Sequence, residues 1–362
     1  MAANDNDFWL KSGIRNTFSY QILDSFNLLP ASDFTLDSSN VESCTITESY
    51  ESDTRISGTL ELKGERPPEG CAIRINHTAT LGDETQTETL GTFMIGSDSP
   101  KYMYGEYSGQ LNLVSMLDRF SSDYAPADTA VSGQNACTWF ENTVTDALDG
   151  TANMTRVNEH LSRTSIMSDW VWEFGTSVLS ALFTCAEKAN ARVSVDAEGH
   201  VTLNQYLVPA DITPTYTVDG NTLEAGIERT DGDRINRVVV KYQPKNDGET
   251  QFGVASLPMG HIWSYRQIKR WLTKTYEVNQ GEEDADTDAQ TLANYYLSLN
   301  DSTTHKWEGS GLYRPLSCGE VGTLSYQDTA TGTPITHKVL LRQKEYTLDA
   351  AMETKYIFSQ LD

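Results

Sequence analysis

The sequence predicts a mainly β protein of the α+β class, and three observations lead to that prediction. Apolar and polar side chains alternate in short segments of the N-terminal and C-terminal parts, a period of two that is typical of half-buried strands. Turn-forming residues separate these segments, which favours an antiparallel sandwich or barrel. Between Gln110 and Asn190 the apolar period lengthens to three or four residues, as in amphipathic helices.

The strand pattern is clearest in the segments 55–62 and 71–76. Their apolar residues share one face of each strand: Ile56, Leu60 and Leu62 in the first, and Cys71, Ile73 and Ile75 in the second. The segments 51–54, 64–70 and 81–84 are rich in Gly, Pro, Asp and Glu and are expected to form the turns.

Three helices are expected in the middle of the chain. The residues that predict the first two are Leu111, Val114 and Leu117 for a helix over 111–117, and Phe140, Val144 and Leu148 for one over 138–148. The third and clearest runs from about Ser177 to Ala189, and Thr176 or Ser177 can cap its N-terminus by accepting a hydrogen bond from a free backbone amide.

A β-hairpin is expected directly after this third helix, with strands over 191–195 and 200–206 around a loop that contains Gly199. A further apolar strand is expected over 234–242. If Asn236–Val240 lies in the core of a sheet, Val239→Asp should abolish soluble folding.

The C-terminal part combines one helix with three strands. Thr287 followed by Gln290 matches a capping box, which predicts a helix over 287–299. Strands are expected over 321–326, 339–346 and 354–359, with a turn at 349–352 between the last two.

The charge of the chain limits its partners. Lys and Arg number 27 against 51 Asp and Glu, so the formal net charge is −24, which disfavours a nucleic acid or an anionic membrane as the binding partner. No apolar run reaches the ~18 residues that a membrane-spanning helix needs. The N-terminus shows no secretory signal, and the five scattered cysteines are expected to be free thiols.

Motifs of enzymes are absent, so the expected catalytic, cofactor and metal residues are none. The sequence contains no GxSxG, P-loop, GxGxxG or HExxH motif. Two alternatives stay open: Trp170 and Trp172 are either a sugar-binding pair or packing residues, and the many carboxylates include pairs that could serve a glycan hydrolase. The stretch His261–Trp271 mixes basic and aromatic residues and fits single-stranded nucleic acid, an edge strand, an interdomain hairpin, or contact with an acidic neighbour.

The order of these pieces resembles the tail hub (baseplate hub) family of bacteriophages. The segments that carry the resemblance are the helix over 178–190 with the hairpin over 191–206, the segment 226–242 with its Asn-Arg-Val-Val-Val strand, the helix over 287–299, and Gly319–Tyr326. The same fold forms the base of type VI secretion spike proteins and the N-terminal part of tail-associated lysins. The sequence ends at Asp362 with no peptidase or lysozyme segment after these pieces, so we expect no lytic activity.

The resemblance implies an architecture. It places two tube-like antiparallel β-barrel domains at 1–110 and 211–362, with a helical and α+β insertion domain at 111–210 between them. Such hubs are homotrimers, so three chains present six similar barrels and adapt a sixfold tail tube to a threefold tip.

The resemblance also implies the function and the partners. The expected function is that of a structural virion protein at the phage tail tip, made in the host cytoplasm and not inserted into a membrane. Its expected partners are two further copies, the ring of the distal tail or tail tube protein, the tape-measure protein and a tip spike or fibre. DNA passes through the ring without specific binding. The alternatives are a cell-wall glycan or peptidoglycan hydrolase of the tail tip and a receptor- or sugar-binding tail module.

Overall fold

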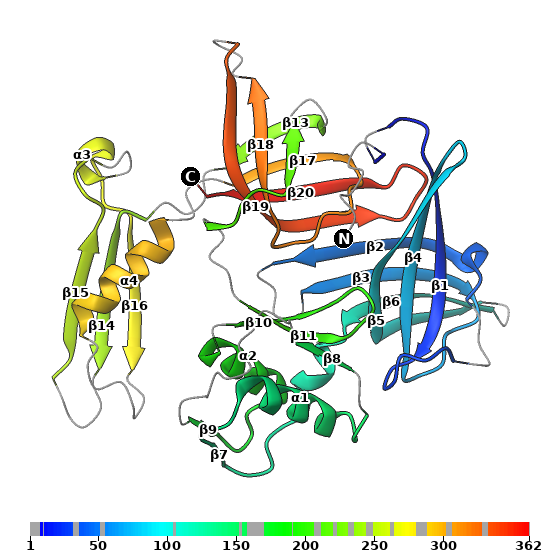
Figure 1. Ribbon diagram of the computed structural model, residues 1–362, viewed down its shortest axis with the longest axis horizontal. Coiled ribbons are helices and arrows are strands. Elements are labelled where there is room, and N and C mark those ends of the chain that lie inside the picture. The colour runs from blue at the N-terminus through cyan, green and yellow to red at the C-terminus, as the bar shows by residue number, and fades with distance from the viewer. Residues whose placement is uncertain are drawn as a thin grey trace. The chain divides into compact units, whose positions relative to one another are not determined.

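The computed structural model describes most of the chain. The described residues are 8–9, 11–31, 36–50, 55–103, 106–151, 154–157, 170–189, 191–205, 211–219, 223–230, 235–243, 249–260, 264–279, 288–301, 306–327 and 332–361. Strands predominate and a few helices accompany them (Figure 1), so the predicted mainly β fold is confirmed. Every helix in these residues is too short or too polar to cross a lipid bilayer.

The chain divides into two compact units that each contain distant parts of the sequence. Unit 1 comprises 1–212, 310–319 and 342–356, and unit 2 comprises 213–309, 320–341 and 357–362. Three strands contribute residues to both units: β17 (Lys306–Leu312), β19 (Pro334–Thr347) and β20 (Glu353–Gln360). The boundaries at 110 and 210 that the family resemblance implies remain a prediction.

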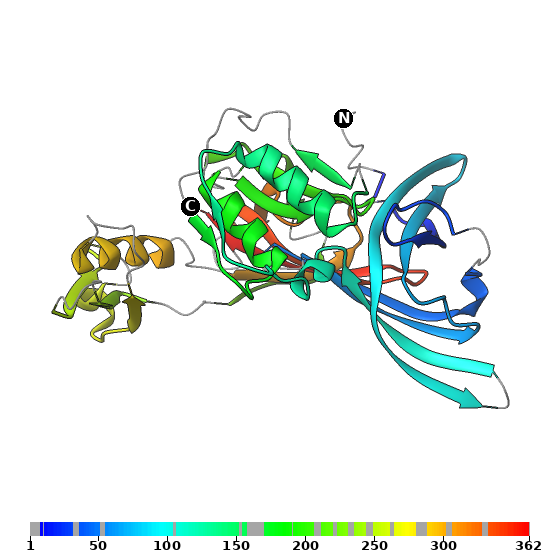
Figure 2. The same cartoon turned by 90° about the horizontal axis from the view of Figure 1, so that it is seen from below.

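The large sheet of unit 1 has the order β1-β4-β5-β6-β3-β2-β19. Its N-terminal strands are β1 (Arg15–Asp24), β2 (Val41–Ser49), β3 (Ile56–Gly64), β4 (Cys71–Leu81), β5 (Glu84–Met103) and β6 (Glu106–Ser115). Pairing in this sheet is antiparallel, and β5 is bulged against both neighbours, at Ile75/Asn76 of β4 and at its own Ile95/Ser97. Bulges bend strands, and Figure 2 shows the sheet curled into a half-barrel.

The predicted helix over 111–117 is wrong, because this segment belongs mainly to strand β6. Leu111 and Leu113 are buried while Asn112 between them is exposed, so the period that matters is two. Backbone pairing with β3 on one side and β5 on the other satisfies the peptide groups of β6. The spacing of Leu111, Val114 and Leu117 also fits a helix, but pairing with the two neighbouring strands makes this segment a strand.

A second layer of unit 1 contains, in the described residues, two α-helices and five short strands. The elements of this layer are η2 (Asp118–Ser121), β7 (Thr129–Val131), α1 (Ala136–Ala147), β8 (Thr155–Val157), β9 (Trp170–Trp172), α2 (Val178–Lys188), β10 (Ala191–Val195) and β11 (Val201–Gln205). The short helix η1 (Ser38–Asn40) instead contacts β1 and β3 of the large sheet. The predicted helices over 138–148 and 177–189 are confirmed, as is the hairpin. Ser177 caps α2, since its side chain accepts a hydrogen bond from the Ser180 amide at 3.2 Å.

Unit 2 contains two sheets. Its larger sheet has the order β12-β18-β19-β20-β17-β13, where β12 is Tyr216–Asp219, β13 is Leu223–Thr230 and β18 is Val321–Gln327. Its smaller sheet has the order β15-β14-β16 and is covered on one face by a helix; the elements are β14 (Arg237–Gln243), β15 (Gln251–Ser256), α3 (Tyr265–Ile268), β16 (Thr273–Asn279) and α4 (Ala289–Asp301). The β12–β18 and β14–β16 pairs of this unit are parallel, as is the β8–β11 pair of unit 1.

The cap of α4 differs from the predicted capping box. Asp288 accepts the hydrogen bond of the Thr291 amide at 2.7 Å, and this bond lowers the pKa of the Asp288 carboxyl. Gln290 instead bonds the backbone of β15, donating to the Val254 carbonyl at 2.9 Å. Thr287 lies outside the described residues.

Helix α4 lies directly on the small sheet. A Cβ on Gly253 would sit 1.8 Å from the Ala289 carbonyl, so only glycine allows this approach. Val238 and Val240 are fully buried under the helix, whereas Val239 faces the other side and is only half-buried. The expectation that an Asp in this strand abolishes soluble folding therefore applies to Val238 and Val240 and not to Val239.

We expect Val240→Asp to prevent soluble folding and Val239→Asp to be tolerated. The first places an unpaired carboxylate in the core, at a cost on the order of 4 kcal/mol. The second costs about 1 kcal/mol, as a poor strand former on a half-exposed face. Soluble yield and urea unfolding of the two variants measure the difference, and equal stability of both variants would contradict this placement of the strand.

A buried lysine joins the C-terminal strand β19 to β2. Lys344 is 2% exposed and lies opposite Glu48 in the antiparallel pair. Its Nζ donates to the Leu316 carbonyl at 2.8 Å and lies 2.9 Å from Glu48 Oε1. It is also 5.0 Å from the ring centroids of Tyr313 and Tyr346.

Lys344→Met should lower the free energy of unfolding by ~3 kcal/mol, because it removes the buried cation that pairs with the largely buried Glu48 carboxylate. The double variant Lys344→Met/Glu48→Gln should recover part of the loss, since it removes the stranded charge. Urea unfolding of the three proteins measures both effects. A Lys344→Met protein as stable as the parent would show that the ion pair does not hold this strand.

Candidate functional site

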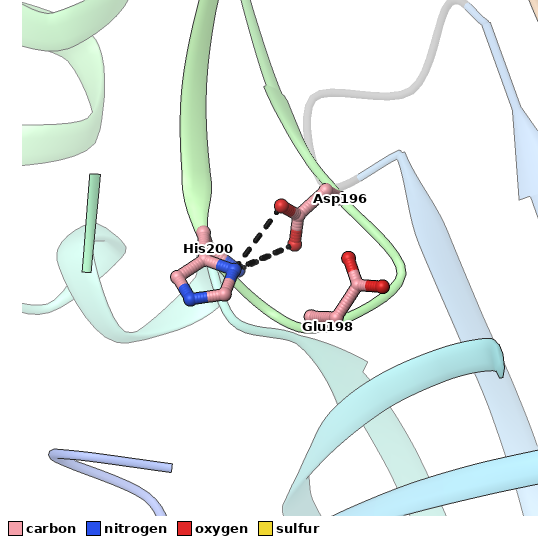
Figure 3. A group of neighbouring side chains, drawn as sticks. All are labelled: Asp196, Glu198 and His200. Carbon is pink, nitrogen blue, oxygen red and sulfur yellow. Dashed lines mark hydrogen bonds and ion pairs between the residues drawn. The ribbon is translucent and has the colours of Figure 1, made fainter. Parts of the chain in front are cut away.

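The tip of the β10–β11 hairpin carries a group of ionisable side chains: Asp196, Glu198 and His200 (Figure 3). One ligand atom from each lies within 4.8 Å of the others, and in the described part of the chain no other group of three His, Cys, Asp or Glu side chains is as close. His200 Nδ1 lies 3.1 Å from both oxygens of the Asp196 carboxylate. Carboxylates and imidazole are metal-ligand types, so this cluster is a candidate binding site.

Asp196 builds the turn on which the cluster stands. Its Oδ1 accepts the hydrogen bond of the His200 amide at 2.8 Å, and its carbonyl accepts that of the Gly199 amide at 3.0 Å. Gly199 has φ +95°, a conformation that glycine adopts without strain. The turn brings Asp196 and His200 together at the end of the antiparallel pair Val195–Val201.

Arg156 of β8 supplies the positive charge of the cluster. Its Nη1 lies 3.2 Å from Asp196 Oδ2 and 3.9 Å from Glu198 Oε2. β8 lies parallel to β11, with Thr155 opposite Val201, so the sheet itself places this arginine beside the turn. The two carboxylates therefore have a cation from the chain, and the geometry of the cluster is explained without a metal ion.

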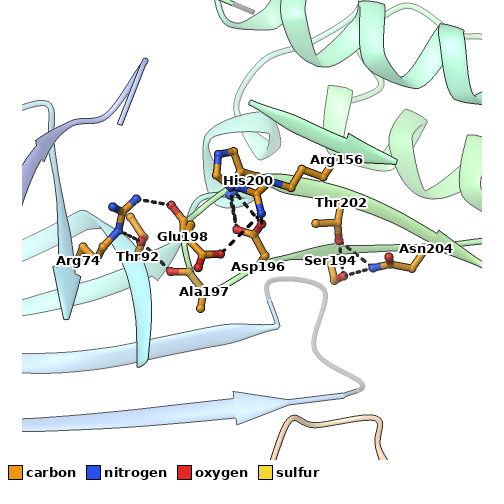
Figure 4. Close-up of polar contacts among 10 residues, drawn as sticks. All are labelled: Arg74, Thr92, Arg156, Ser194, Asp196, Ala197, Glu198, His200, Thr202 and Asn204. Carbon is orange, nitrogen blue, oxygen red and sulfur yellow. Dashed lines mark hydrogen bonds and ion pairs between the residues drawn. The ribbon is translucent and has the colours of Figure 1, made fainter. Parts of the chain in front are cut away.

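The same hairpin tip is bonded to the large sheet of unit 1 (Figure 4). Arg74 of β4 donates to the Glu198 carbonyl at 2.7 Å, and Thr92 of β5 donates to the Ala197 carbonyl at 2.8 Å. Arg74 Nε also donates to Thr92 Oγ1 at 3.1 Å, which fixes both side chains. The arrangement can hold the helical layer of unit 1 on its curled sheet, and this is the role that the geometry supports.

The sequence predicts the hairpin but not the side chains that bind its tip. Arg74, Thr92 and Arg156 lie far from the hairpin in the sequence, and no motif marks them. The one hint in the sequence was Gly199 in a loop that also contains Asp196, because Asp and Gly together favour a tight turn.

The structure places Trp170 and Trp172 in a packing role. Both lie on β9, and each ring meets Trp139 of α1 edge to face, with centroids 5.5 and 6.1 Å apart. Trp172 Nε1 donates to the Thr176 carbonyl at 3.1 Å. Both rings are half-buried, so neither offers a free face of the kind on which a sugar ring stacks.

The basic and aromatic stretch forms a helical turn rather than an edge strand. Tyr265–Ile268 is α3, and Lys269 ends it in the left-handed conformation with φ 60°. Tyr265 and Trp271 stack with centroids 4.6 Å apart. His261 and Trp263 lie outside the described residues.

The histidines and cysteines of the described residues have structural surroundings. His77 is fully buried between Glu88 at 3.2 Å and Asn16 at 2.9 Å. The five cysteines are free, as predicted. Burial raises the pKa of Cys44, Cys185 and Cys318 to about 12, which keeps these thiols protonated and unreactive at neutral pH.

Gly199→Ala should destabilise the protein by ~1 kcal/mol more than Gly175→Ala does. Both substitutions place a Cβ at positive φ, which costs about 1 kcal/mol. Only at residue 199 would the new Cβ also lie 3.0 Å from Thr92 Cβ, whereas nothing lies within 4 Å at residue 175. Thermal unfolding of the two variants measures the difference, and equal losses would argue against close packing of the hairpin on β5.

Comparison with known proteins gives matches in structure and none in sequence. No protein-family model matches this chain, and no curated protein is similar to it in sequence. The tail protein from Neisseria meningitidis matches with a TM-score of 0.60 at 13% identity, over 94% of this chain and 96% of that one. The 43 kDa tail protein of prophage MuSo2 from Shewanella oneidensis matches with a TM-score of 0.58 at 11% identity, over 96% and 97%.

A third similar structure is a complex of two proteins. The half-lidded PdpA–VgrG complex of Francisella matches with a TM-score of 0.59 at 9% identity, over 97% of this chain and 58% of that chain. At sequence identities this low, a structural match shows a similar fold and does not show a shared function. The chain therefore has a fold similar to that of the two phage tail proteins and of a chain of the PdpA–VgrG complex, which agrees with the fold that the resemblance to the tail hub family implied.

Proposed function

We propose that this chain is a structural protein of a phage tail, and more narrowly the hub that forms a homotrimeric ring at the distal end of the tail tube. The observation that supports this most is the match to two phage tail proteins over nearly the full length of both chains. A shared domain inside an unrelated enzyme would leave a large unmatched part in one of the two chains.

The architecture of the units suits a ring. Each unit contains at least six strands of one twelve-stranded sheet, and the part of this sheet in unit 1 is curled. If each unit contributes one tube-like sheet, three copies supply six and meet a sixfold tube with a threefold ring. The ring would enclose a channel for the tape-measure protein and then for DNA, and it would contact the distal tail or tail tube protein above and a spike or fibre below.

The charge also suits a conduit for DNA. A net charge of −24 gives the surface a negative potential, and a negative wall repels phosphate at short range. DNA can then pass without being held. The same charge disfavours a role in which the chain must bind nucleic acid or an anionic membrane.

The sugar-binding alternative lacks support from the geometry, because Trp170 and Trp172 pack on Trp139. A cell-wall hydrolase is tested directly by turbidity loss of purified cell walls. The hub proposal expects no loss beyond that of a heat-denatured sample.

Two measurements test the proposal. The mass of the native protein should be three times the chain mass of 40.2 kDa, as measured by sedimentation velocity, and gold-labelled antibody should mark the distal end of the tail tube in negative stain. The proposed place in the virion would be wrong if the label marked the whole tube or the head, or if purified particles carried no label.

The wall of the axial channel should be acidic. Reconstruction of the assembled ring should show more Asp and Glu than Lys and Arg among the side chains that face the axis, because a basic wall would retain DNA. A basic or neutral wall would refute this explanation of the negative charge, while leaving the place in the tail intact.

A further inference from the structure

One end of the small sheet in unit 2 exposes a cluster of basic and aromatic side chains. We call it the basic aromatic patch, and it comprises Arg237, Tyr265, Arg266, Lys269, Arg270 and Trp271. Trp271 is its centre: Tyr265 stacks on one side of it, and the Arg237 guanidinium lies 5.2 Å from its ring centroid. Tyr265 and Trp271 each remain 45% exposed, so the cluster is ordered by its own contacts and yet open to a partner.

The patch is a basic island in an acidic chain. In the described residues between Ile235 and Asn279, six of the eight charged side chains are basic, whereas the whole chain carries 51 acidic and 27 basic residues. None of the four cations of the patch has a carboxylate partner among the residues that the structure describes. Exposed aromatic residues and arginines are the side chains that protein interfaces favour.

A second exposed cluster, in unit 1, has the opposite charge. We call it the acidic aromatic edge, and it comprises Asp123, Tyr124, Asp128, Val171, Glu173 and Phe174. Val171 is 53% exposed, Tyr124 55% and Phe174 72%. Val171 stands on β9 with its side chain away from the Trp139 contact that its neighbours make, and Ala130 of β7 lies opposite it.

This edge is well ordered and has no basic residue of its own. Asp128 Oδ1 accepts the hydrogen bond of the Phe174 amide at 2.8 Å, and Ala125 and Gly175 bond through their backbones at 3.1 Å. No Lys or Arg occurs in the sequence between Arg119 and Arg156, nor between Arg163 and Lys188. Among the described residues no Lys or Arg forms an ion pair with these carboxylates, so the edge presents apolar side chains beside negative charge.

We propose that the basic aromatic patch of one copy of this chain binds the acidic aromatic edge of the next copy. The two surfaces match in both respects, since each places exposed apolar side chains next to charges of opposite sign. Contact between two different surfaces is head to tail, and such contacts close into a ring when the rotation between copies allows it. This inference rests on the proposed homotrimer and names the surfaces that join its subunits.

A second copy is a better occupant of the patch than a nucleic acid. A strand of nucleic acid could stack on Trp271, but its phosphates would meet few further cations outside the patch, because the chain has 27 basic and 51 acidic residues. A second copy offers the acidic aromatic edge, whose carboxylates and apolar side chains complement the patch. Other copies are also present wherever the chain is made.

Charge reversal of each surface, alone and together, tests the proposal. Arg266→Glu/Arg270→Glu and, separately, Asp123→Lys/Glu173→Lys should each weaken self-association about tenfold or more in sedimentation velocity at low ionic strength. The chain that carries all four substitutions should regain association, because its two surfaces are again complementary. About 1 M salt, which shortens the Debye length to about 3 Å, should weaken the parent assembly as well.

The matched control for the arginine reversal is Lys11→Glu/Lys306→Glu, which changes the net charge by the same amount and in the same direction at two exposed lysines outside the patch. This protein should associate like the parent. Circular dichroism and the melting temperature establish that each variant is folded. A parent that stays monomeric at high concentration and low salt, or reversals that act no more strongly than the control, would overturn the proposal.

Carbodiimide cross-linking locates the contact. In a mixture of light and isotope-labelled chains, Lys269 should link to Asp123, Asp128 or Glu173 of a different chain. Links that form only within one chain would refute the proposal, as would an assembly without these links. Binding of a labelled single-stranded oligonucleotide that Arg266→Glu/Arg270→Glu abolishes would assign the patch to nucleic acid instead.

Failure of the proposed interface can be distinguished from failure of the proposed function. If gold label marks the tail tip and the mass is that of a trimer, while the reversals leave the trimer unchanged, the hub stands and only its interface is placed wrongly. If the protein is absent from the tail, the proposed function fails whatever the surfaces do.

Discussion

The fold of unit 1 depends on one buried ion pair near the end of the chain. Lys344 reaches the core between β19 and β2, where Glu48, the Leu316 carbonyl and two tyrosine rings surround its ammonium group. A buried ion pair gains little over an apolar pair of the same shape, but a wrong register would leave both charges unpaired. The pair therefore specifies which strand closes the edge of the sheet at β2 and in which register.

This closure explains why each unit is built from distant segments. Residues 342–356 join a sheet whose other strands come from the N-terminal part of the chain. Residues 310–319 bring Tyr313 into the same core and the Leu316 carbonyl to Lys344. Burial of Tyr313 and Tyr346 raises the pKa of both phenols well above the usual value, so they stay neutral beside Glu48 and Glu88. Since the core of unit 1 includes Tyr346, Leu348 and Met352, this core is complete only when the C-terminal strands are in place.

The sequence predicted the elements whose cause is local. The Ser177 cap, helix α2 and the hairpin around Gly199 follow from residues that are neighbours in the chain. The helix predicted over 111–117 is wrong because the spacing of this segment fits a helix, and only pairing with β3 and β5 decides for a strand. The roles of Lys344, Arg74 and Arg156 could not be predicted, because a charged residue in a strand is usually exposed. Their partners also lie 28 to 296 residues away in the sequence, and only the fold brings them into contact. These partners are Leu316, Glu48, Glu198 and Asp196.

The uneven distribution of charge gives the molecule two kinds of surface from one composition. Screening confines electrostatic effects to about 8 Å at physiological ionic strength, so a net charge of −24 acts locally rather than as one field. A wall of carboxylates repels DNA only where the DNA comes close, and the basic aromatic patch attracts only a surface brought into contact with it. A ring can therefore hold its subunits through opposite charges and still let a polyanion pass, provided that the patch lies away from the channel.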